Sequence, residues 1–394
     1  MNAAVPARFE FATATRIVFG AGTAAELPTL VAGLGRRVLV VTGSSVARHA
    51  AAIESLRASV EAVDLVSIAS EPTVADAEAG AARARASACS VVVGLGGGSA
   101  IDAGKAIAAL APNPGPALNS LEVVGRGLPL PHPSLPYIAV PTTAGTGAEV
   151  TRNAVLGVPD ARVKVSLRSA HMLPRIALVD PALARGLPAA VTAATGMDAL
   201  TQLIEPFLSC RANPLVDALC RDGIARVARA LPRALEAPDA LSHRGDLALG
   251  ALYSGMALAN AGLGAVHGFA APIGGSFSAP HGAVCATLLP PVLRAHLDAL
   301  RSRGSDHAAL ARFDELASLL TGRIGASAVE AVDFCTMLVE SLGIPSLRRW
   351  GIAEEHVGDL VTKAMGASSM KANPLPLSRG ELTGIVRAAL ATGT

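Results

Sequence analysis

Charged and aromatic residues are both scarce in this sequence. Asp, Glu, Lys and Arg together make up 16% of its 394 residues, and Phe, Trp and Tyr only 3%. Modules that bind single-stranded nucleic acid stack bases on aromatic side chains, so the shortage of aromatics argues against such modules. The formal net charge of +2 is nearly balanced and no basic stripe is present. We therefore expect no nucleic-acid partner.

Cysteine is sparse as well. The five cysteines are scattered, odd in number and without a CxxC pair. This usage fits reduced thiols in a cytosolic chain and does not fit a cysteine zinc site. The opening residues, MNAAVPARFEFATATRI, lack the apolar segment of a signal peptide. We expect a cytoplasmic protein.

One long stretch, residues 247–293, contains no Asp, Glu, Lys or Arg. A membrane span is not expected, because Pro272, a Gly-Gly-Ser break at 274–276 and other interruptions leave no clean apolar span with charged flanks. The stretch predicts two buried helices joined by that glycine-rich turn, each with one histidine, His267 and His281. Buried histidines need partners, which the rest of the chain should supply.

Two domains are expected from the pattern of the chain. Residues 1–182 alternate short apolar runs, typical of parallel strands buried on both faces, with Ala-rich helical segments. This alternation predicts a doubly wound, mostly parallel, Rossmann-like α/β sheet. Strands are expected at 16–19, 37–42, 62–68, 90–94, 137–141 and 175–180, a hairpin at 155–165, and helices at 23–34, 46–58, 73–86 and 100–110.

Strand signals are absent from residues 183–394, which we expect to form an all-helical domain. Apolar residues there recur at helical spacing. Helices are predicted at 188–209, 215–235, 246–260, 263–273, 281–297, 309–320, 328–342, 353–364 and 378–392.

A glycine-rich segment follows the apolar run SVVVG. Gly96, Gly97, Gly98 and Ser99 lead directly into a predicted helix. Glycines let the backbone approach a phosphate, and the free N–H groups at a helix start bind its oxygens. A plain tight turn is the alternative. The pattern is not GxGxxG, so it predicts a pyrophosphate site without the usual Rossmann fingerprint.

A second loop, PTTAGTGAEVT at 141–151, also follows an apolar strand. Thr142, Thr143 and Thr146 place hydroxyls around two glycines. A loop at the carboxyl end of a parallel strand can line a cofactor cleft. Alone the pattern is weak, because Thr/Gly loops are common.

Polar side chains in apolar surroundings mark a third motif. Asp198 and Gln202 are four residues apart and share a helical face. With His267 and His281 they form a plausible ligand set for a first-row metal. The alternative is a structural network in which Asp198 orients the histidines. Cys285, close to His281, is interpreted as a small buried apolar residue.

These motifs together resemble the iron-containing (group III) alcohol dehydrogenase family. The resemblance covers most of the chain, and its motifs, in order, are RIVFGAG, GGGSAIDAGK, PTTAGTGAEVT, KVSLRS, VDP, GMDALTQLIEP, AVHGFAAPIGG, PHGAVCATLLP and SSMKANPLPLSRGEL. It implies an α/β nucleotide-binding domain, an all-helical domain, and a cleft holding NAD(P) and a metal. It also implies reversible hydride transfer between the nicotinamide and an alcohol/aldehyde pair, and a homodimer.

The resemblance also implies roles for individual residues. Those on the cofactor side are Gly96, Gly97, Gly98, Ser99, Asp102, Thr142, Thr143, Thr146, Lys164 and Leu183. Metal ligands, Fe²⁺ or Zn²⁺, would be Asp198, His267 and His281, with Gln202 where the family usually has histidine. Ala271 stands where a further histidine often lines the substrate site. Because an amide binds these metals more weakly than imidazole, a weakened or absent metal is expected as an alternative.

The resemblance further bears on the choice of cofactor. Family members that prefer NAD tend to carry an Asp just after the strand corresponding to VLVVT, where Gly43 and Ser44 stand here. Loss of a carboxylate removes repulsion of a 2′-phosphate. We therefore predict that NADPH is tolerated or preferred.

Several reactions remain open from sequence. With metal, the ion would polarise the substrate carbonyl. Without it, His267 or His281 would supply the charge and the proton, as catalytic residues. Maleylacetate-reductase-like reduction of a small oxo acid, with Arg152 for a carboxylate, is a second candidate. A lyase related to dehydroquinate synthase and a non-catalytic nucleotide-binding protein are less favoured.

Overall fold

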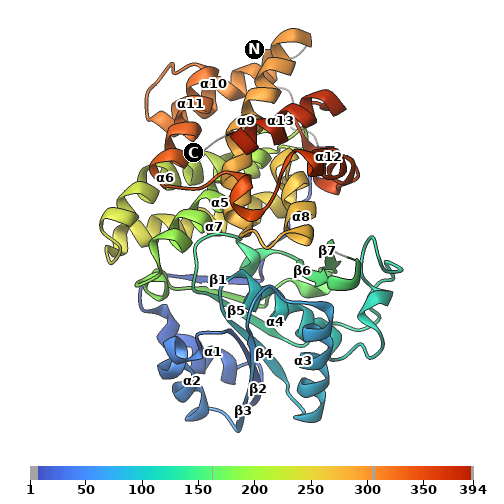
Figure 1. Ribbon diagram of the computed structural model, residues 1–394. Coiled ribbons are helices and arrows are strands. Elements are labelled where there is room, and N and C mark those ends of the chain that lie inside the picture. The colour runs from blue at the N-terminus through green and yellow to red at the C-terminus, as the bar shows by residue number, and fades with distance from the viewer. Residues whose placement is uncertain (1–7, 162, 304–306, 392–394) are drawn as a thin grey trace. The chain divides into compact units, whose positions relative to one another are not determined.

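The computed structural model describes residues 8–161, 163–303 and 307–391 (Figure 1). The chain forms two compact units. The sheet unit contains Thr13–Thr143 and Gly147–Arg185. The helical unit contains the chain from Gly186 onward, together with Ala144–Thr146 and the N-terminal segment up to Ala12. The expectation about a signal peptide rests in part on residues 1–7, which lie outside the described residues.

The sheet unit is built on one parallel sheet of six strands, in the order β1-β8-β5-β4-β2-β3. The strands form where the apolar runs predict them. Only small shifts occur: the strand expected at 90–94 extends further toward its carboxyl end, to Gly96. The strands are β1 (Arg16–Phe19), β2 (Arg37–Gly43), β3 (Ala62–Ile68), β4 (Val91–Gly96), β5 (Tyr137–Pro141) and β8 (Ile176–Val179).

Both faces of this sheet are buried, as the continuous apolar runs predict. Alternate residues of a strand point to opposite faces. Val38 and Val40 belong to one apolar cluster, and Leu39 and Val41 belong to another. The first cluster includes residues of α1 (Leu27–Ala32) and α2 (Ala50–Arg57), and the second includes residues of α3 (Val74–Ala86) and α4 (Gly98–Leu110). The sheet with helices on both faces confirms the expected doubly wound α/β class (Figure 1).

The direction in which successive strands are added to the sheet reverses between β2 and β4, and this point is called the chain reversal below. From β2 the chain moves outward to β3, then returns past β2 to β4 and continues to β5 and β8. In open parallel sheets, ligands bind beyond the carboxyl ends of the strands at such a reversal. A separate antiparallel hairpin, β6 (Asn153–Val158) and β7 (Val163–Arg168), turns at Pro159–Ala161 as the sequence predicts. Residue 162, within the predicted hairpin, lies outside the described residues.

The helical unit contains no strand among its described residues, in agreement with the predicted all-helical half. Helix α5 lies among α6, α7 and α9 and is buried along most of its length. The helices are α5 (Ala189–Leu208), α6 (Pro214–Glu236), α7 (Leu241–Ala261), α8 (Ala265–Ser276), α9 (His281–Arg303), α10 (His307–Thr321), α11 (Ala328–Ser341), α12 (Val357–Met365) and α13 (Arg379–Ala391). Residue 392, where the last helix was expected to end, lies outside the described residues.

The charge-free stretch 247–293 differs from the expectation in one respect. The glycine-rich turn predicted at 274–276 is wrong, because these residues form the last turn of α8. Gly275 and its neighbours remain helical because the Phe277 N–H still bonds to the Ile273 carbonyl. The break falls later, before Pro280, and the stretch therefore covers the end of α7, all of α8 and the start of α9.

One described helix, α9, is long and apolar enough to cross a membrane when judged by length and composition alone. Its apolar window is 78% buried within the protein. Helices α7 and α8 pass the same test only as a pair, with a bend of 100° between them. Burial against other helices is the ordinary situation of a core helix, so these segments need no membrane to cover their apolar surface.

Candidate functional site

Three predicted ligands converge in the helical unit. Asp198 Oδ1, on α5, lies 3.5 Å from Nε2 of His267 on α8 and 3.7 Å from Nε2 of His281 on α9. Asp198 is 2% exposed, and its Oδ1 atom has no hydrogen-bond partner among the described residues. An unpartnered buried carboxylate oxygen is costly unless a cation neutralises it. The three groups therefore fit a bound divalent metal.

The charges of this cluster are strongly coupled. Burial alone would raise the pKa of Asp198, but the positive charge of His281 and the contacts of His267 and Gln202 outweigh it and lower that pKa. Burial would likewise lower the pKa of His267, but the negative charges of Cys285 and Glu205 raise it well above its ordinary value. The cluster thus favours an ionised Asp198 carboxylate that faces two protonated imidazoles. A metal ion bound there would take the place of the imidazole protons.

Glu205 fixes the orientation of His267. The Nδ1 of His267 lies 2.6 Å from Glu205 Oε2, and the other carboxylate oxygen accepts the Val266 N–H at 2.7 Å. The second contact satisfies a free N–H at the start of α8. With its proton held on Nδ1 by Glu205, His267 presents Nε2 to Asp198, which is the arrangement of a metal-binding histidine and its carboxylate support.

Gly282 allows α9 to approach α5 closely. A Cβ atom at this position would lie 2.2 Å from the Ala194 carbonyl oxygen and 3.3 Å from the Asp198 Cβ. Any larger residue would therefore force the two helices apart. Because His281 is the neighbouring residue, this contact determines how near its imidazole comes to Asp198.

Gln202 lies one turn from Asp198 on α5, as predicted, but its oxygen has another partner. Gln202 Oε1 accepts a hydrogen bond from Ser254 Oγ at 3.4 Å. The Gln202 side chain also contacts the Asp198 carboxylate and helps to keep its pKa low. Gln202 is thus beside the cluster as a hydrogen-bonding neighbour.

Cys285 joins the cluster, which sequence reasoning missed. Its Sγ atom lies 3.7 Å from Nε2 of His267 and 3.7 Å from Nε2 of His281. Burial would raise the pKa of this thiol, but the two neighbouring imidazoles outweigh burial and lower it. The spacing could have revealed it, because Cys285 is four residues after His281 and so lies on the same face of one helix. Glu205, seven residues after Asp198, shares a helix face with Asp198 in the same way.

In the sheet unit, the glycine loop lies at the chain reversal. Gly96 ends β4, Gly97 is the N-cap of α4 in extended conformation without a side-chain cap, and Gly98 and Ser99 begin the helix. The first N–H groups of α4 therefore remain available for an anion. A Cβ at Gly96 would lie 3.3 Å from the Gly43 nitrogen, which shows how closely the ends of β2 and β4 adjoin.

Two threonines of the second predicted loop lie beside the glycine loop. The Thr142 N–H donates to the Gly96 carbonyl at 2.9 Å. A Cβ on Gly97 would lie 3.4 Å from Thr143 Oγ1, so these two threonines adjoin the glycine loop. Thr146 belongs to the segment Ala144–Thr146, which is part of the helical unit, and its cofactor role stays a prediction.

The other predicted cofactor residues have varied surroundings. Asp102 accepts the Val155 N–H at 3.0 Å and is paired with Lys105, 3.2 Å away. Lys164, on β7, forms an ion pair with Glu71. Leu183 follows β8 and packs on the apolar cluster beneath α1 and α2. Ser44 is exposed immediately after β2. Asp102 therefore joins α4 to the β6–β7 hairpin through its hydrogen bond to Val155. Its role toward a cofactor stays a prediction.

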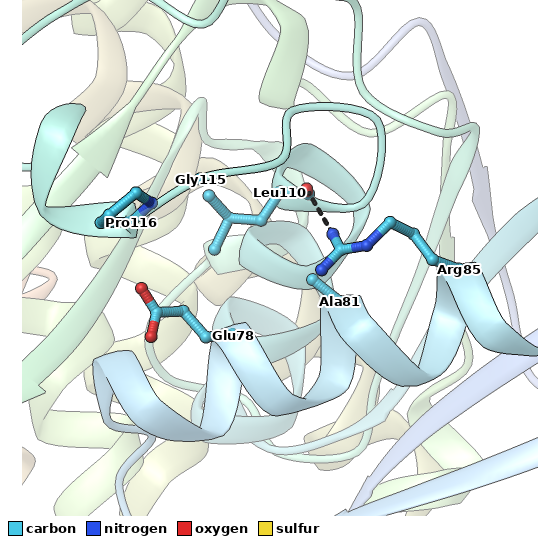
Figure 2. Close-up of a pocket in the computed structure, with 6 residues that line it drawn as sticks. All are labelled: Glu78, Ala81, Arg85, Leu110, Gly115 and Pro116. Atoms are coloured by element: carbon cyan, nitrogen blue, oxygen red, sulfur yellow. Dashed lines mark hydrogen bonds between the residues drawn. The ribbon is translucent and has the colours of Figure 1, made fainter.

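A separate cavity of about 340 Å³ opens on the sheet unit beside α3 (Figure 2). Its charged residues already have partners: Glu78 accepts the Ala117 N–H at 2.7 Å, and Arg85 donates to the Leu110 carbonyl at 3.2 Å. None of the predicted site residues lines it. The cavity therefore adds nothing to the candidate site.

Comparison with known families matches nearly the whole chain. Residues 14–181 match the family "Iron-containing alcohol dehydrogenase", and residues 192–390 match "Fe-containing alcohol dehydrogenase family, C-terminal". The chain is 38% identical over 301 residues to 1,3-propanediol dehydrogenase of Klebsiella pneumoniae, which covers 76% of each chain.

Solved structures agree with this match. A crystal structure of 1,3-propanediol oxidoreductase has a TM-score of 0.88 and 31% identity, and covers 97% of this chain and 100% of that one. Sulfoacetaldehyde reductase from Bifidobacterium kashiwanohense, solved in complex with NAD⁺, has a TM-score of 0.85 and 27% identity, covering 98% and 100%.

Proposed function

Because this chain belongs to the iron-containing alcohol dehydrogenase family, we propose that it transfers a hydride reversibly between NAD(P)H and a small alcohol/aldehyde pair. It is an oxidoreductase of the alcohol dehydrogenase type. The similarity to enzymes named for 1,3-propanediol supports a small alcohol as the substrate class. The observation that carries the proposal is the convergence of Asp198, His267 and His281 around one unpartnered carboxylate oxygen.

The helical unit supplies the chemistry at the carbonyl. Asp198 Oδ1 and the Nε2 atoms of His267 and His281 would hold the metal, with Fe²⁺ and Zn²⁺ as candidates. When bound, a divalent ion is a Lewis acid that polarises the substrate carbonyl and stabilises the charge that develops on its oxygen. Glu205 keeps the proton on Nδ1 of His267, so that Nε2 stays available as a ligand.

The sheet unit supplies the cofactor site. The N–H groups of Gly98 and Ser99 at the start of α4 bind the pyrophosphate, and Gly96 and Gly97 let the phosphates approach the backbone. Thr142 and Thr143 contribute from the end of the neighbouring strand β5. The position of this loop, at the chain reversal between β2 and β4, supports the assignment.

NADPH is the preferred or tolerated cofactor in this proposal. Gly43 ends β2 beside Gly96, where a ribose-binding carboxylate would stand in an NAD-specific site. Arg48 follows in the same connection, is exposed, and donates to the Arg185 carbonyl at 2.8 Å. Its guanidinium is suited to a 2′-phosphate.

The sheet edges and the cysteines bear on the assembly and the compartment. The six-stranded sheet ends in β1 and β3, whose outer edges can pair with a second copy. All five cysteines are free, as expected of a reducing compartment. We propose a cytoplasmic homodimer on these grounds.

The experiment measures the decrease in nicotinamide absorbance when the protein is mixed with each of a panel of small aldehydes. Protein purified without chelator and loaded separately with Fe²⁺ or Zn²⁺ is assayed with NADH and with NADPH. We expect reduction of at least one small aldehyde, with NADPH giving the higher kcat/KM. No turnover with any aldehyde and either cofactor would contradict the proposed activity, and a strong preference for NADH would contradict the cofactor assignment.

A further inference from the structure

We propose that Cys285, and not Gln202, supplies the fourth protein ligand of the metal site, and that the site therefore selects Zn²⁺ or Co²⁺ over Fe²⁺. The inference rests on the proposed function, because Asp198, His267 and His281 hold the same ion in both. It changes the donor set from one acid, two imidazoles and an amide to one acid, two imidazoles and a thiolate.

The position of Cys285 on α9 makes this possible. It lies four residues after His281, so both side chains leave the same face of one helix. The residue is fully buried, and its sulfur has no nearer polar partner in the described part of the chain than the two histidine nitrogens. The thiol thus faces into the cluster.

Four of the six separations between the donor atoms lie in the range of a tetrahedral site. Metal–ligand bonds of about 2.0–2.3 Å place tetrahedral ligand atoms roughly 3.3–3.8 Å apart. The sulfur is 3.7 Å from each Nε2 of His267 and His281, and Asp198 Oδ1 is 3.5 and 3.7 Å from the same atoms. All four donor atoms lie within 4.8 Å of one another.

The carboxylate of Asp198 gives an independent reason to expect an ion at this place. Its Oδ1 is buried without a hydrogen-bond partner among residues 8–161, 163–303 and 307–391, and it faces the same two nitrogens as the sulfur. Simple packing of a small apolar residue would not require a buried carboxylate oxygen without a hydrogen bond beside it. A cation at the centre of the four donors satisfies it.

Gln202 is less suited to the fourth place. Its amide N–H donates to the Asp198 carboxylate, so the nitrogen, which cannot bind a metal, is the amide atom next to that ligand, while Oε1 lies 3.4 Å from Ser254 Oγ. Ser254 lies on α7, a helix that contributes no donor to the cluster. Gln202 therefore serves as a neighbour of Asp198, and the thiol of Cys285 stands in place of the missing imidazole.

A thiolate changes which metal the site prefers. Soft sulfur donors select zinc and other soft or borderline ions, whereas a set of oxygen and nitrogen donors suits iron(II). On binding, the Cys285 S–H bond breaks, a metal–sulfur bond forms and the proton goes to solvent. No electron is transferred, so the step needs no oxidant.

Cobalt(II) substitution tests the inference by spectroscopy, because Co²⁺ replaces Zn²⁺ and shows a sulfur-to-cobalt charge-transfer band in the near ultraviolet. Titration of metal-free full-length protein with Co²⁺ should give this band with one equivalent. Cys285→Ala should lose the band and bind Co²⁺ at least about tenfold more weakly, or about 1.4 kcal/mol. Cys335→Ala, which removes another fully buried thiol, should keep both.

A parallel variant separates the two candidate ligands. Gln202→Ala should keep the charge-transfer band and bind Co²⁺ within a few-fold of the unaltered protein. A band that survives in Cys285→Ala, or a larger loss of affinity in Gln202→Ala, would overturn the inference, as would the absence of any Co²⁺ binding. Aldehyde reduction measured on the same samples reports separately on the proposed function, since an active enzyme without the sulfur band refutes only the role of Cys285.

Discussion

At the scale of single residues, the sheet unit buries an acid and a base in one polar network. Lys105 is fully buried and donates to Thr151 Oγ1 at 2.7 Å and to the Asn153 carbonyl at 2.5 Å. Glu149 is buried nearby, and burial raises its pKa to about 7. A carboxyl group that prefers its proton at neutral pH weakens the folded state whenever it ionises.

Glu149→Gln should flatten part of the pH dependence of stability. The folded pKa of Glu149, about 7, is above the ordinary 4.5, so the folded state binds the proton more tightly and loses this stabilisation as pH rises from 4.5 to 7. The loss is on the order of 1–3 kcal/mol. The Tm difference between Glu149→Gln and the unaltered protein, measured from pH 4.5 to 7.5, should shift in favour of the variant. An unchanged difference would show that Glu149 does not titrate there.

Gly43→Asp should change the cofactor preference. A Cβ at Gly43 meets no atom within 4 Å, so the first carbon of a new side chain fits there. The new carboxylate repels a 2′-phosphate and accepts hydrogen bonds from ribose hydroxyls, and the ratio of kcat/KM for NADPH over NADH should fall at least about tenfold, or about 1.4 kcal/mol. Gly43→Ala, which adds volume without charge, is the control. Equal ratios in all three proteins would contradict the prediction.

Sequence reasoning at this scale succeeded where a residue type carries chemistry by itself. The histidines and Asp198 were identified and do meet, because a buried charge must have partners. The thiol of Cys285 was taken for an apolar residue, since one cysteine in an apolar helix has no distinguishing pattern until the folded chain brings His267 beside it. Glu205 was missed for the same reason.

At the scale of elements, the site depends on how three helices pack. Asp198 is carried by α5, His267 by α8 and His281 by α9. Two features hold this arrangement: the Glu205 carboxylate that bonds to the start of α8, and the glycine contact between α9 and α5. Each can be altered separately.

Gly282→Ala should separate α9 from α5 and weaken the metal site. The added Cβ would lie 2.2 Å from a backbone oxygen, which cannot move aside as a side chain can. Overpacking of this kind costs about 1–3 kcal/mol. We expect a lower Tm and less bound metal per chain. Gly245→Ala, on α7, has open space around its new methyl group and should change neither. Equal metal content in both variants would contradict this account.

Glu205→Gln should weaken metal binding with little effect on the fold. Loss of the charged partner of His267 Nδ1 lowers the basicity of Nε2, and loss of such a support typically costs about 10–100-fold in metal affinity. Competition with a chromogenic chelator measures the affinity. Glu315→Gln, which removes a carboxylate paired with Arg221 in the same unit, is the matched control and should leave it unchanged. An unchanged affinity in Glu205→Gln would remove Glu205 from the site.

The helices and strands themselves follow from the apolar pattern, and most ends differ by only a few residues. The exception near Gly275 has a clear cause: glycines were read as a turn, but the hydrogen bond from Phe277 to Ile273 continues the helix through them. A glycine in a helix costs only about 1 kcal/mol. The local sequence does not show whether a hydrogen bond such as this one forms and offsets that cost.

At the scale of the whole molecule, the proposed function assigns one part of the reaction to each unit. The sheet unit contains the glycine loop, and the helical unit contains the candidate metal ligands. The order of strands and helices along the sequence was enough to predict both folds, because parallel sheets require covering helices. A domain boundary at residue 182 remains a prediction, as do the homodimer and the natural substrate.

The central claim is that Asp198, His267 and His281 hold a metal that carries the carbonyl chemistry. Its most direct test is kcat/KM for aldehyde reduction in metal-loaded Asp198→Asn, compared with unaltered protein before and after metal removal. The substitution keeps the shape of the side chain, so its Tm should stay near that of metal-free unaltered protein. Loss of the Lewis acid costs several kcal/mol, and we predict a fall of at least about a hundredfold for the variant and for the stripped enzyme alike. Full activity of either one would contradict the account.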